Sequence, residues 1–200
     1  MVFMTHSNRT TRWVAFAPLL AAVLTPQIVS AAQVVGGVAT SLTYYAPSAN
    51  FASKAFDGST GTANGWGNNG TMPEWLKYDF TNGVQYIVTN YALYCNSSQA
   101  GGWAGYYPRT WTFEGSNSAV GGWTVLDTKA GQTIVENAWT NYPVTNFTAY
   151  SSYRFNITVG NANYCSIPEA EFAYFSGSLP VISNSPAVNM GSTNASLVGN

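Results

Sequence analysis

The sequence predicts an all-β fold, an eight-stranded antiparallel β-sandwich. Charged residues make up only 8% of the chain, whereas aromatic residues make up 15%. The apolar residues come in short alternating runs bounded by Gly, Asn and Pro, which is typical of strands joined by turns. No segment shows a sustained 3.6-residue periodicity, so we expect helix only as single turns within loops.

The predicted strands share a two-residue alternation. In 91–94 and 153–157 the large apolar residues recur at every second position, which buries one face of a sheet and leaves the other in water. Two such sheets packed face to face form a sandwich. The predicted strands are 74–80, 86–94, 110–114, 123–128, 132–136, 142–144, 152–159 and 170–175.

The N-terminal segment 1–31 has the pattern of a secretory signal peptide. Arg9 and Arg12 precede an apolar run from Trp13 to Val29, which is followed by small residues. A membrane-spanning helix is the weaker interpretation, because the run contains prolines and falls short of about 20 uninterrupted apolar residues. We therefore expect a secreted protein, located outside the cell or at its surface.

The C-terminal segment 177–200 is predicted to be a linker. Its composition shifts to Ser, Gly and Pro, and its last residues resemble the opening strand of an immunoglobulin-like or fibronectin-like domain that is cut short. A disordered end is the alternative. The remaining segment, 32–176, is the predicted folded domain.

The charge balance argues against two classes of partner. Without segment 1–31 the chain keeps five basic residues against eight acidic ones, a net charge of −3. The basic residues occur singly, so no cationic stripe is present to neutralise phosphates. Anionic lipid likewise needs clustered Lys and Arg. We expect neither nucleic acid nor strong membrane binding.

The sequence predicts no enzyme activity within this chain. The only histidine, His6, lies in the predicted signal peptide, so the usual general base for a Ser, Cys or Thr nucleophile is missing. Carboxylate pairs remain candidates for glycoside hydrolysis, but no cleft signature accompanies them. A catalytic domain elsewhere in a parent protein stays open.

Three blocks of the sequence carry a family resemblance: WLKYDF at 75–80, PRTWTFEGSN at 108–117 and YRFNIT at 153–158. Their order and spacing resemble the discoidin family, which includes the coagulation factor V/VIII type C domains and galactose-binding-like carbohydrate modules. The resemblance implies a discoidin-like jelly roll and a binding role, because members of this family mostly bind rather than catalyse. Trp75 and Trp111 lie within these blocks and are expected to pack in the core.

The loop around Asp57 is a candidate cation site. It places one carboxylate and several short oxygen donors in a tight turn, which suits a hard cation such as calcium, although Asp-Gly also forms ordinary turns. The resemblance implies a structural calcium held by this loop and the start of the last strand. Glu169 is the alternative to Glu171, because Pro168 leaves two registers open. The implied ligands are Lys54, Asp57, Ser59, Thr62, Ala170 and Glu171.

The segment 96–107 is the predicted ligand-binding loop. It places three large aromatic residues in a Gly-rich stretch between strands. Such rings pack against the C–H face of a sugar, while amides and an arginine hydrogen-bond to its hydroxyls. Capping of the open end of the sandwich is the alternative role for these rings. The predicted ligand-binding residues are Asn68, Asn96, Trp103, Tyr106, Tyr107, Arg109, Asn163 and Tyr164.

Cys95 and Cys165 are the only cysteines of the chain. In an exported protein a disulfide between them is the economical interpretation, and two buried free thiols are the alternative.

The sequence therefore predicts a secreted, non-catalytic carbohydrate-binding module that serves adhesion or targeting within a larger extracellular protein. Its expected partner is a glycan or polysaccharide, and the module is expected to be monomeric. Two alternatives stay open: a structural or protein-interaction spacer domain, and the anchoring module of a glycoside hydrolase whose catalytic domain lies outside this chain.

Overall fold

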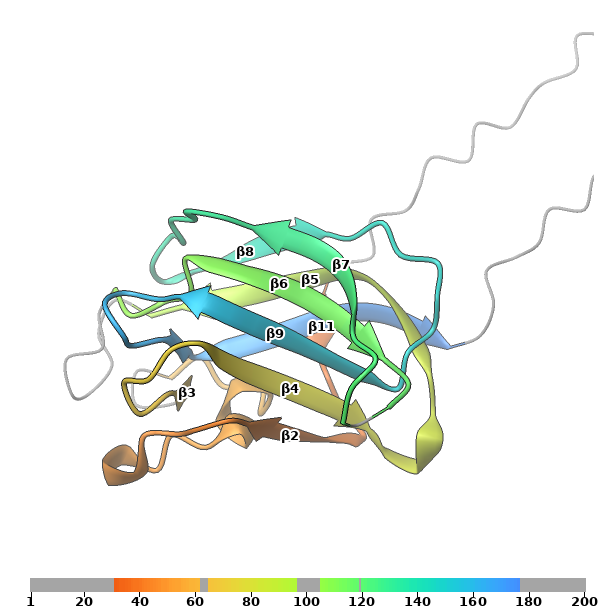
Figure 1. The fold of residues 1–200 in the computed structure, drawn as a ribbon, viewed down its shortest axis with the longest axis horizontal. Helices are drawn as coiled ribbons and strands as arrows, with labels where there is room; N and C mark the ends of the chain where they lie inside the picture. The colour runs from red at the N-terminus through yellow and green to blue at the C-terminus, as the bar shows by residue number, and fades with distance from the viewer. Residues whose placement is uncertain (1–30, 62–64, 97–104, 119, 177–200) are drawn as a thin grey trace, which may run out of the picture.

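The computed structural model describes residues 31–61, 65–96, 105–118 and 120–176. They form two main antiparallel sheets packed face to face (Figure 1). Within these residues, no helix has the length and apolarity needed to span a membrane. The helical segments of this part are the 3₁₀ turns η1 (Ala46–Ser48), η2 (Ala52–Ala55) and η3 (Thr81–Gly83).

One sheet has five strands and the other has four. The five-stranded sheet has the order β2 (Gly37–Ser41), β4 (Glu74–Phe80), β9 (Ser152–Val159), β6 (Thr110–Ser116) and β7 (Thr124–Lys129). The four-stranded sheet has the order β1 (Ala32–Gln33), β11 (Glu169–Ser176), β5 (Tyr86–Cys95) and β8 (Ala138–Pro143). A further pair of two-residue strands, β3 (Trp66–Gly67) and β10 (Ser166–Ile167), is separate from both.

The antiparallel β-sandwich predicted from the sequence is confirmed, but the count of eight strands is not, because the described residues contain eleven. The predicted strand 132–136 is wrong: only Ile134 of this stretch is buried, and the ladder with β5 begins later, at Ala138. Residues 1–30 of the predicted signal peptide 1–31 and the tail 177–200 lie outside the described residues, and both assignments stay predictions.

Aromatic rings fill the space between the sheets. Phe172 of β11 is 1% exposed and lies at the centre, facing strands of the opposite sheet. Its ring centroid is 5.5 Å from that of Phe113 and 6.2 Å from that of Phe155. The rings of Phe56, Tyr78 and Tyr153 surround it at 5.9 to 6.4 Å. Tilted and edge-to-face contacts at these separations are favourable beyond the apolar area that they bury.

Tyrosine hydroxyls join the two sheets where the core is polar. Tyr91 of β5 donates to Asp127 of β7 at 2.8 Å and accepts the indole N–H of Trp111 at 2.9 Å. Tyr153 of β9 donates to the carbonyl oxygen of Tyr86 at 2.6 Å. Because these buried polar groups have partners in the opposite sheet, they help to fix how the sheets are aligned.

Replacing Phe172 with Ala is expected to lower the free energy of unfolding by about 3–5 kcal/mol, because it removes a buried ring and leaves a cavity. Phe172→Leu keeps part of the volume and should lose less. The matched control is Phe147→Ala, since Phe147 is 71% exposed and its loss should change stability by no more than about 0.5 kcal/mol. Urea denaturation measures all three. Equal losses for Phe172→Ala and Phe147→Ala would contradict a central role for Phe172.

Candidate functional site

Three loops meet at the end of the sandwich where β4 begins and β9 ends, at the left of Figure 1. They span residues 68–73, 105–109 and 160–165, and we call this region the loop end. The amide of Ser166 donates to the carbonyl oxygen of Tyr106 at 2.5 Å, which ties the second loop to the chain that follows the third.

Asn68 connects the first loop to the third. It is fully buried, and its Nδ2 donates to the carbonyl oxygens of Thr71 at 2.7 Å and Asn163 at 3.0 Å. Its Oδ1 accepts the amide of Cys165 at 2.9 Å. Both ends of the Asn68 amide are thus used inside the protein. Positioning of the loops fits this environment better than the direct sugar contact expected from the sequence.

A buried carboxylate fixes the approach to the first loop. Glu74 is 1% exposed and accepts the Thr43 amide at 3.1 Å, the Thr43 hydroxyl, and the Trp75 amide at 2.8 Å. The Thr43 hydroxyl in turn accepts the amide of Asn69 at 3.3 Å. Burial raises the pKa of Glu74, and the hydrogen bonds from Thr43 and Trp75 oppose that shift.

Two tyrosine rings lie side by side at the loop end. Tyr164 is 36% exposed, and its ring rests on the backbone of Gly70. A side chain at Gly70 would come within 2.9 Å of that ring, and the φ of +88° there also favours glycine. The ring of Tyr106 packs edge-on against Tyr164, with centroids 5.4 Å apart. The side-chain amide of Asn161 lies next to Gly105 at the edge of this pair.

Tyr107 and Arg109 are arranged differently from Tyr106. Tyr107 is partly buried against the core, which is the capping role that the sequence left open as an alternative. Arg109 is exposed, and its guanidinium carbon lies 5.9 Å from the centre of the Tyr107 ring. The backbone of Arg109 is held by hydrogen bonds of 2.8 Å with Val159 and Gln132. The guanidinium is thus presented beside Tyr107.

The other predicted ligand-binding residues have separate positions. Asn163 is exposed at the loop end. Asn96 is 4% exposed, and its Nδ2 donates to the carbonyl oxygen of Thr60 at 3.3 Å, so it belongs to the surroundings of the Asp57 loop. Trp103 lies outside the described residues. Sequence reasoning missed Gly70 and Asn161. The Gly-Asn-rich stretch 67–70 was the available signal for the first of these.

Two carboxylates converge in the candidate cation site. The amide of Ser59 lies 2.9 Å from Oδ1 of Asp57 and 3.2 Å from Oε2 of Glu169. Glu169 is 0% exposed, and its Oε1 is buried without a hydrogen-bond partner. Burial, with a smaller contribution from the charge of Asp57, raises the pKa of Glu169 to about 8. The two carboxylates accept a hydrogen bond from the same amide, and Oε1 of Glu169 is buried without a partner. Such a group of carboxylate oxygens fits a hard cation.

The remaining predicted calcium ligands differ in their positions relative to Asp57 and Glu169. Lys54 lies in η2, just before the Asp57 loop, and Ala170 is buried in β11 opposite Leu93. Glu171 is half-buried and pairs with Gln33 of β1. Of the two glutamates considered from the sequence, Glu169 is therefore the one that hydrogen-bonds to the loop. Thr62 lies outside the described residues.

Cys95 and Cys165 are both buried and are free thiols in the structure. Burial raises the pKa of Cys95 to about 11 and raises that of Cys165 well above its ordinary value. Burial disfavours the charged thiolate of each cysteine, so both thiols are protonated at neutral pH. The disulfide expected from the sequence is not formed here, and the pairing stays a prediction.

Neither a family model nor a curated protein matches this sequence, but solved structures do. Chitosan-binding module 1 from a chitosanase/glucanase of Paenibacillus sp. IK-5 superposes with a TM-score of 0.55 at 22% identity, over 70% of this chain and 96% of the module. The family 32 carbohydrate-binding module of Clostridium perfringens NanJ, solved with galactose, gives 0.54 at 16% identity, over 70% and 94%. Chitosan-binding module 2 of the Paenibacillus enzyme, solved with chitotriose, gives 0.54 at 17%, over 71% and 98%.

The chain shares the fold of these carbohydrate-binding modules. The shared fold confirms the discoidin-like β-sandwich that the three sequence blocks predict. At these identities the likeness concerns the fold, and the positions of binding residues have to be argued from this chain.

The raised pKa of Glu169 predicts a pH dependence of stability in the presence of a chelator. A carboxyl group with a pKa of 4.5 in the unfolded chain and about 8 in the folded one favours folding while it is protonated. Its contribution is fully present below about pH 4.5 and is lost as the pH rises through about 8. The free energy of unfolding of Glu169→Gln should fall less over this range than that of the parent. Identical pH profiles for the two proteins would contradict the assignment.

Proposed function

We propose that this chain is a secreted, non-catalytic carbohydrate-binding module whose loop end binds a glycan. The observation that carries the proposal is the half-exposed Tyr164 ring, which lies on Gly70 beside Tyr106. A flat aromatic ring offers its face to the C–H side of a pyranose, and the exposed Asn163 amide offers directional hydrogen bonds to hydroxyls. Arg109 adds a planar donor at the same end.

The rigidity of the loop end supports the proposal further. Asn68 and Glu74 fix the loops through buried hydrogen bonds, so the rings do not have to be ordered when a ligand binds. Preorganisation lowers the cost of binding, which matters most for a shallow site that buries little area. The neighbours solved with galactose and chitotriose have the same fold. The parent protein is then a larger extracellular protein that this module targets to its glycan.

Replacing Tyr164 with Ala is expected to weaken glycan binding by about tenfold or more, because the exposed ring is lost while the core stays intact. The parent chain is first screened on a glycan array that includes galactosides and chito-oligosaccharides, and isothermal titration then measures the affinity for the best glycan. The matched control is Phe147→Ala, which removes an exposed ring at the opposite end of the sandwich, where β8 leads into β9 (Figure 1).

Normal binding by Tyr164→Ala, or an equal loss in Phe147→Ala, would contradict a glycan site at the loop end. If the parent chain binds no glycan on the array, carbohydrate binding itself would be contradicted. That result would favour the spacer or protein-docking alternative.

We further propose that Asp57 and Glu169 hold a structural calcium ion, with backbone oxygens of the Asp57 loop as additional ligands. Two converging carboxylates and the unpartnered Oε1 of Glu169 support this assignment. The ion would supply positive charge between the carboxylates and tie the loop to the first residues of β11. No chemistry on the glycan is assigned to it.

Calcium at about 100 times its Kd should raise the free energy of unfolding by about 2.7 kcal/mol. This gain should disappear in Glu169→Gln and persist in the matched variant Glu171→Gln, two residues further along β11. Thermal unfolding with calcium and with a chelator measures the difference. If only Glu171→Gln loses the stabilisation by calcium, Glu171 is the ligand, as expected from the sequence. If calcium does not stabilise the parent chain, the calcium site is refuted.

A further inference from the structure

The outer face of the five-stranded sheet carries a tryptophan where the sequence placed a core residue. Along β4 the buried side chains are Glu74, Leu76, Tyr78 and Phe80, and the residues between them point outward. Trp75 is therefore half-buried on the outside of the sheet and does not belong to the core.

Two rows of side chains cross this outer face. In the first row, Trp75 of β4 pairs with Asn156 of β9, which pairs with Thr112 of β6. In the second row, Lys77 pairs with Arg154, which pairs with Glu114. Outward side chains that are paired across antiparallel strands lie next to each other. The face thus presents an indole, an amide and a guanidinium within one small area.

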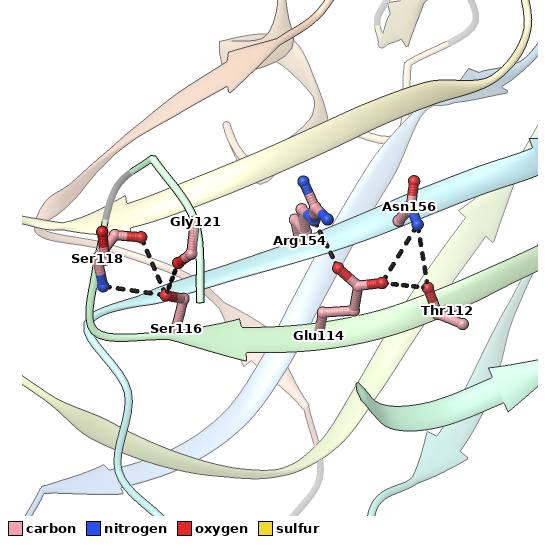
Figure 2. Close-up of polar contacts among 7 residues, drawn as sticks. All are labelled: Thr112, Glu114, Ser116, Ser118, Gly121, Arg154 and Asn156. Atoms are coloured by element: carbon pink, nitrogen blue, oxygen red, sulfur yellow. Dashed lines mark hydrogen bonds and ion pairs between the residues drawn. The ribbon is translucent and has the colours of Figure 1, made fainter. Parts of the chain in front are cut away.

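Glu114 holds the centre of this area in place (Figure 2). Its Oε2 accepts the Nε–H of Arg154 at 2.6 Å, and its Oε1 accepts the hydroxyl of Thr112 at 2.5 Å and the Nδ2 of Asn156 at 3.2 Å. Among the described residues no hydrogen bond uses the terminal Nη groups of Arg154. These planar donors, and Oδ1 of Asn156, are directed by Glu114 and remain for a ligand.

A second indole covers Arg154 from the loop between β6 and β7. The guanidinium carbon of Arg154 lies 4.3 Å from the centre of the Trp123 ring. Trp123 precedes β7, and the loop before it is folded back by Ser116, whose Oγ donates to the carbonyl oxygen of Gly121 at 2.5 Å and accepts the Ser118 amide at 3.0 Å (Figure 2). The conformation of this loop therefore places Trp123 over the sheet.

The charges on this face are paired within the sheet. Lys77 contacts Asp79 at 2.7 Å, and Arg154 contacts Glu114 at 2.6 Å. Two positive and two negative side chains leave no net charge for an anionic polymer to follow. The face is neutral and aromatic, and it is lined by directional hydrogen-bonding groups.

We propose that this surface, formed by Trp75, Lys77, Arg154, Asn156 and Trp123 and called the sheet platform, is a second glycan-binding surface that takes an uncharged polysaccharide chain. The inference rests on the proposed function in one respect, that the chain binds carbohydrate. The two indoles stack on sugar rings, and the amide and guanidinium bind hydroxyls. Trp75 and Arg154 occupy diagonal positions, which lie about 7–8 Å apart, so the platform extends over more than one sugar unit.

The test uses the full chain and three soluble uncharged polysaccharides: mixed-linkage β-glucan, galactomannan and arabinogalactan. Affinity gel electrophoresis measures retardation of the parent chain and of Trp75→Ala, Trp123→Ala and Tyr164→Ala. The matched control is Trp139→Ala, which removes a 36%-exposed tryptophan from β8 in the other sheet. Near-ultraviolet circular dichroism establishes that each variant is folded. Arg154→Lys retains the charge but loses the planar donor.

Trp75→Ala and Trp123→Ala are each expected to weaken polysaccharide binding by about tenfold, with Arg154→Lys intermediate and Trp139→Ala unchanged. Binding to galactose or glucose by isothermal titration should be the same in the platform variants as in the parent. Retardation should also be insensitive to salt between about 0.05 and 0.5 M NaCl, because the face is neutral.

Full retardation of both tryptophan variants, with loss only in Tyr164→Ala, would overturn the platform and leave the loop end as the binding site. Loss of retardation in the platform variants, with normal retardation of Tyr164→Ala, would support the platform as the polysaccharide site. The loop end is then judged by the oligosaccharide titration of Tyr164→Ala. No retardation of the parent chain by any of the three polysaccharides would overturn the platform, and the glycan array then decides separately whether the loop end binds a glycan.

Discussion

The packing of Phe172 against rings of the opposite sheet is the contact on which the rest of the structure depends. Only about a twelfth of the chain is charged, so the fold has few ion pairs and relies on buried apolar area. Phe172 meets aromatic rings that come from β4, β6 and β9, the three central strands of the five-stranded sheet. The inward side chains of these strands fill the core. Their outward side chains are consequently displayed at fixed positions on the surface, and their ends determine where the loops leave the sandwich.

Buried polar groups hold the loops of the loop end in fixed positions on the sandwich. Asn68 and Glu74 are almost completely buried, and each connects segments that are far apart in the sequence. An unpaired amide or carboxylate in such a place would be costly, so the hydrogen bonds permit few loop conformations. Gly70 then allows the Tyr164 ring to lie directly on the backbone. The same principle operates on the sheet face, where Glu114 orients an amide and a guanidinium at once.

Strands with strict alternation were predicted well, and residues whose burial depends on distant partners were not. The bounds of β4 and β9 follow from apolar residues at every second position. β2 was missed because its sequence, GVATS, is barely apolar and is held by its ladder with β4. Local hydrophobicity favours Trp75 over Glu74 for the core, but Leu76, Tyr78 and Phe80 fix the register, and Glu74 is accommodated inside by Thr43. The register after Pro168 needed the contact of Glu169 with Ser59, which no local pattern reveals.

The most direct test of a glycan site at the loop end is an NMR titration of the ¹⁵N-labelled chain with an oligosaccharide of the best-binding glycan. Amide shift changes concentrated at Gly70, Tyr106, Asn163 and Tyr164 are the expected result, since these residues surround the exposed ring. Shift changes confined to the opposite end of the sandwich, around Phe147, would contradict a binding site at the loop end. So would an unchanged spectrum at a glycan concentration that saturates binding.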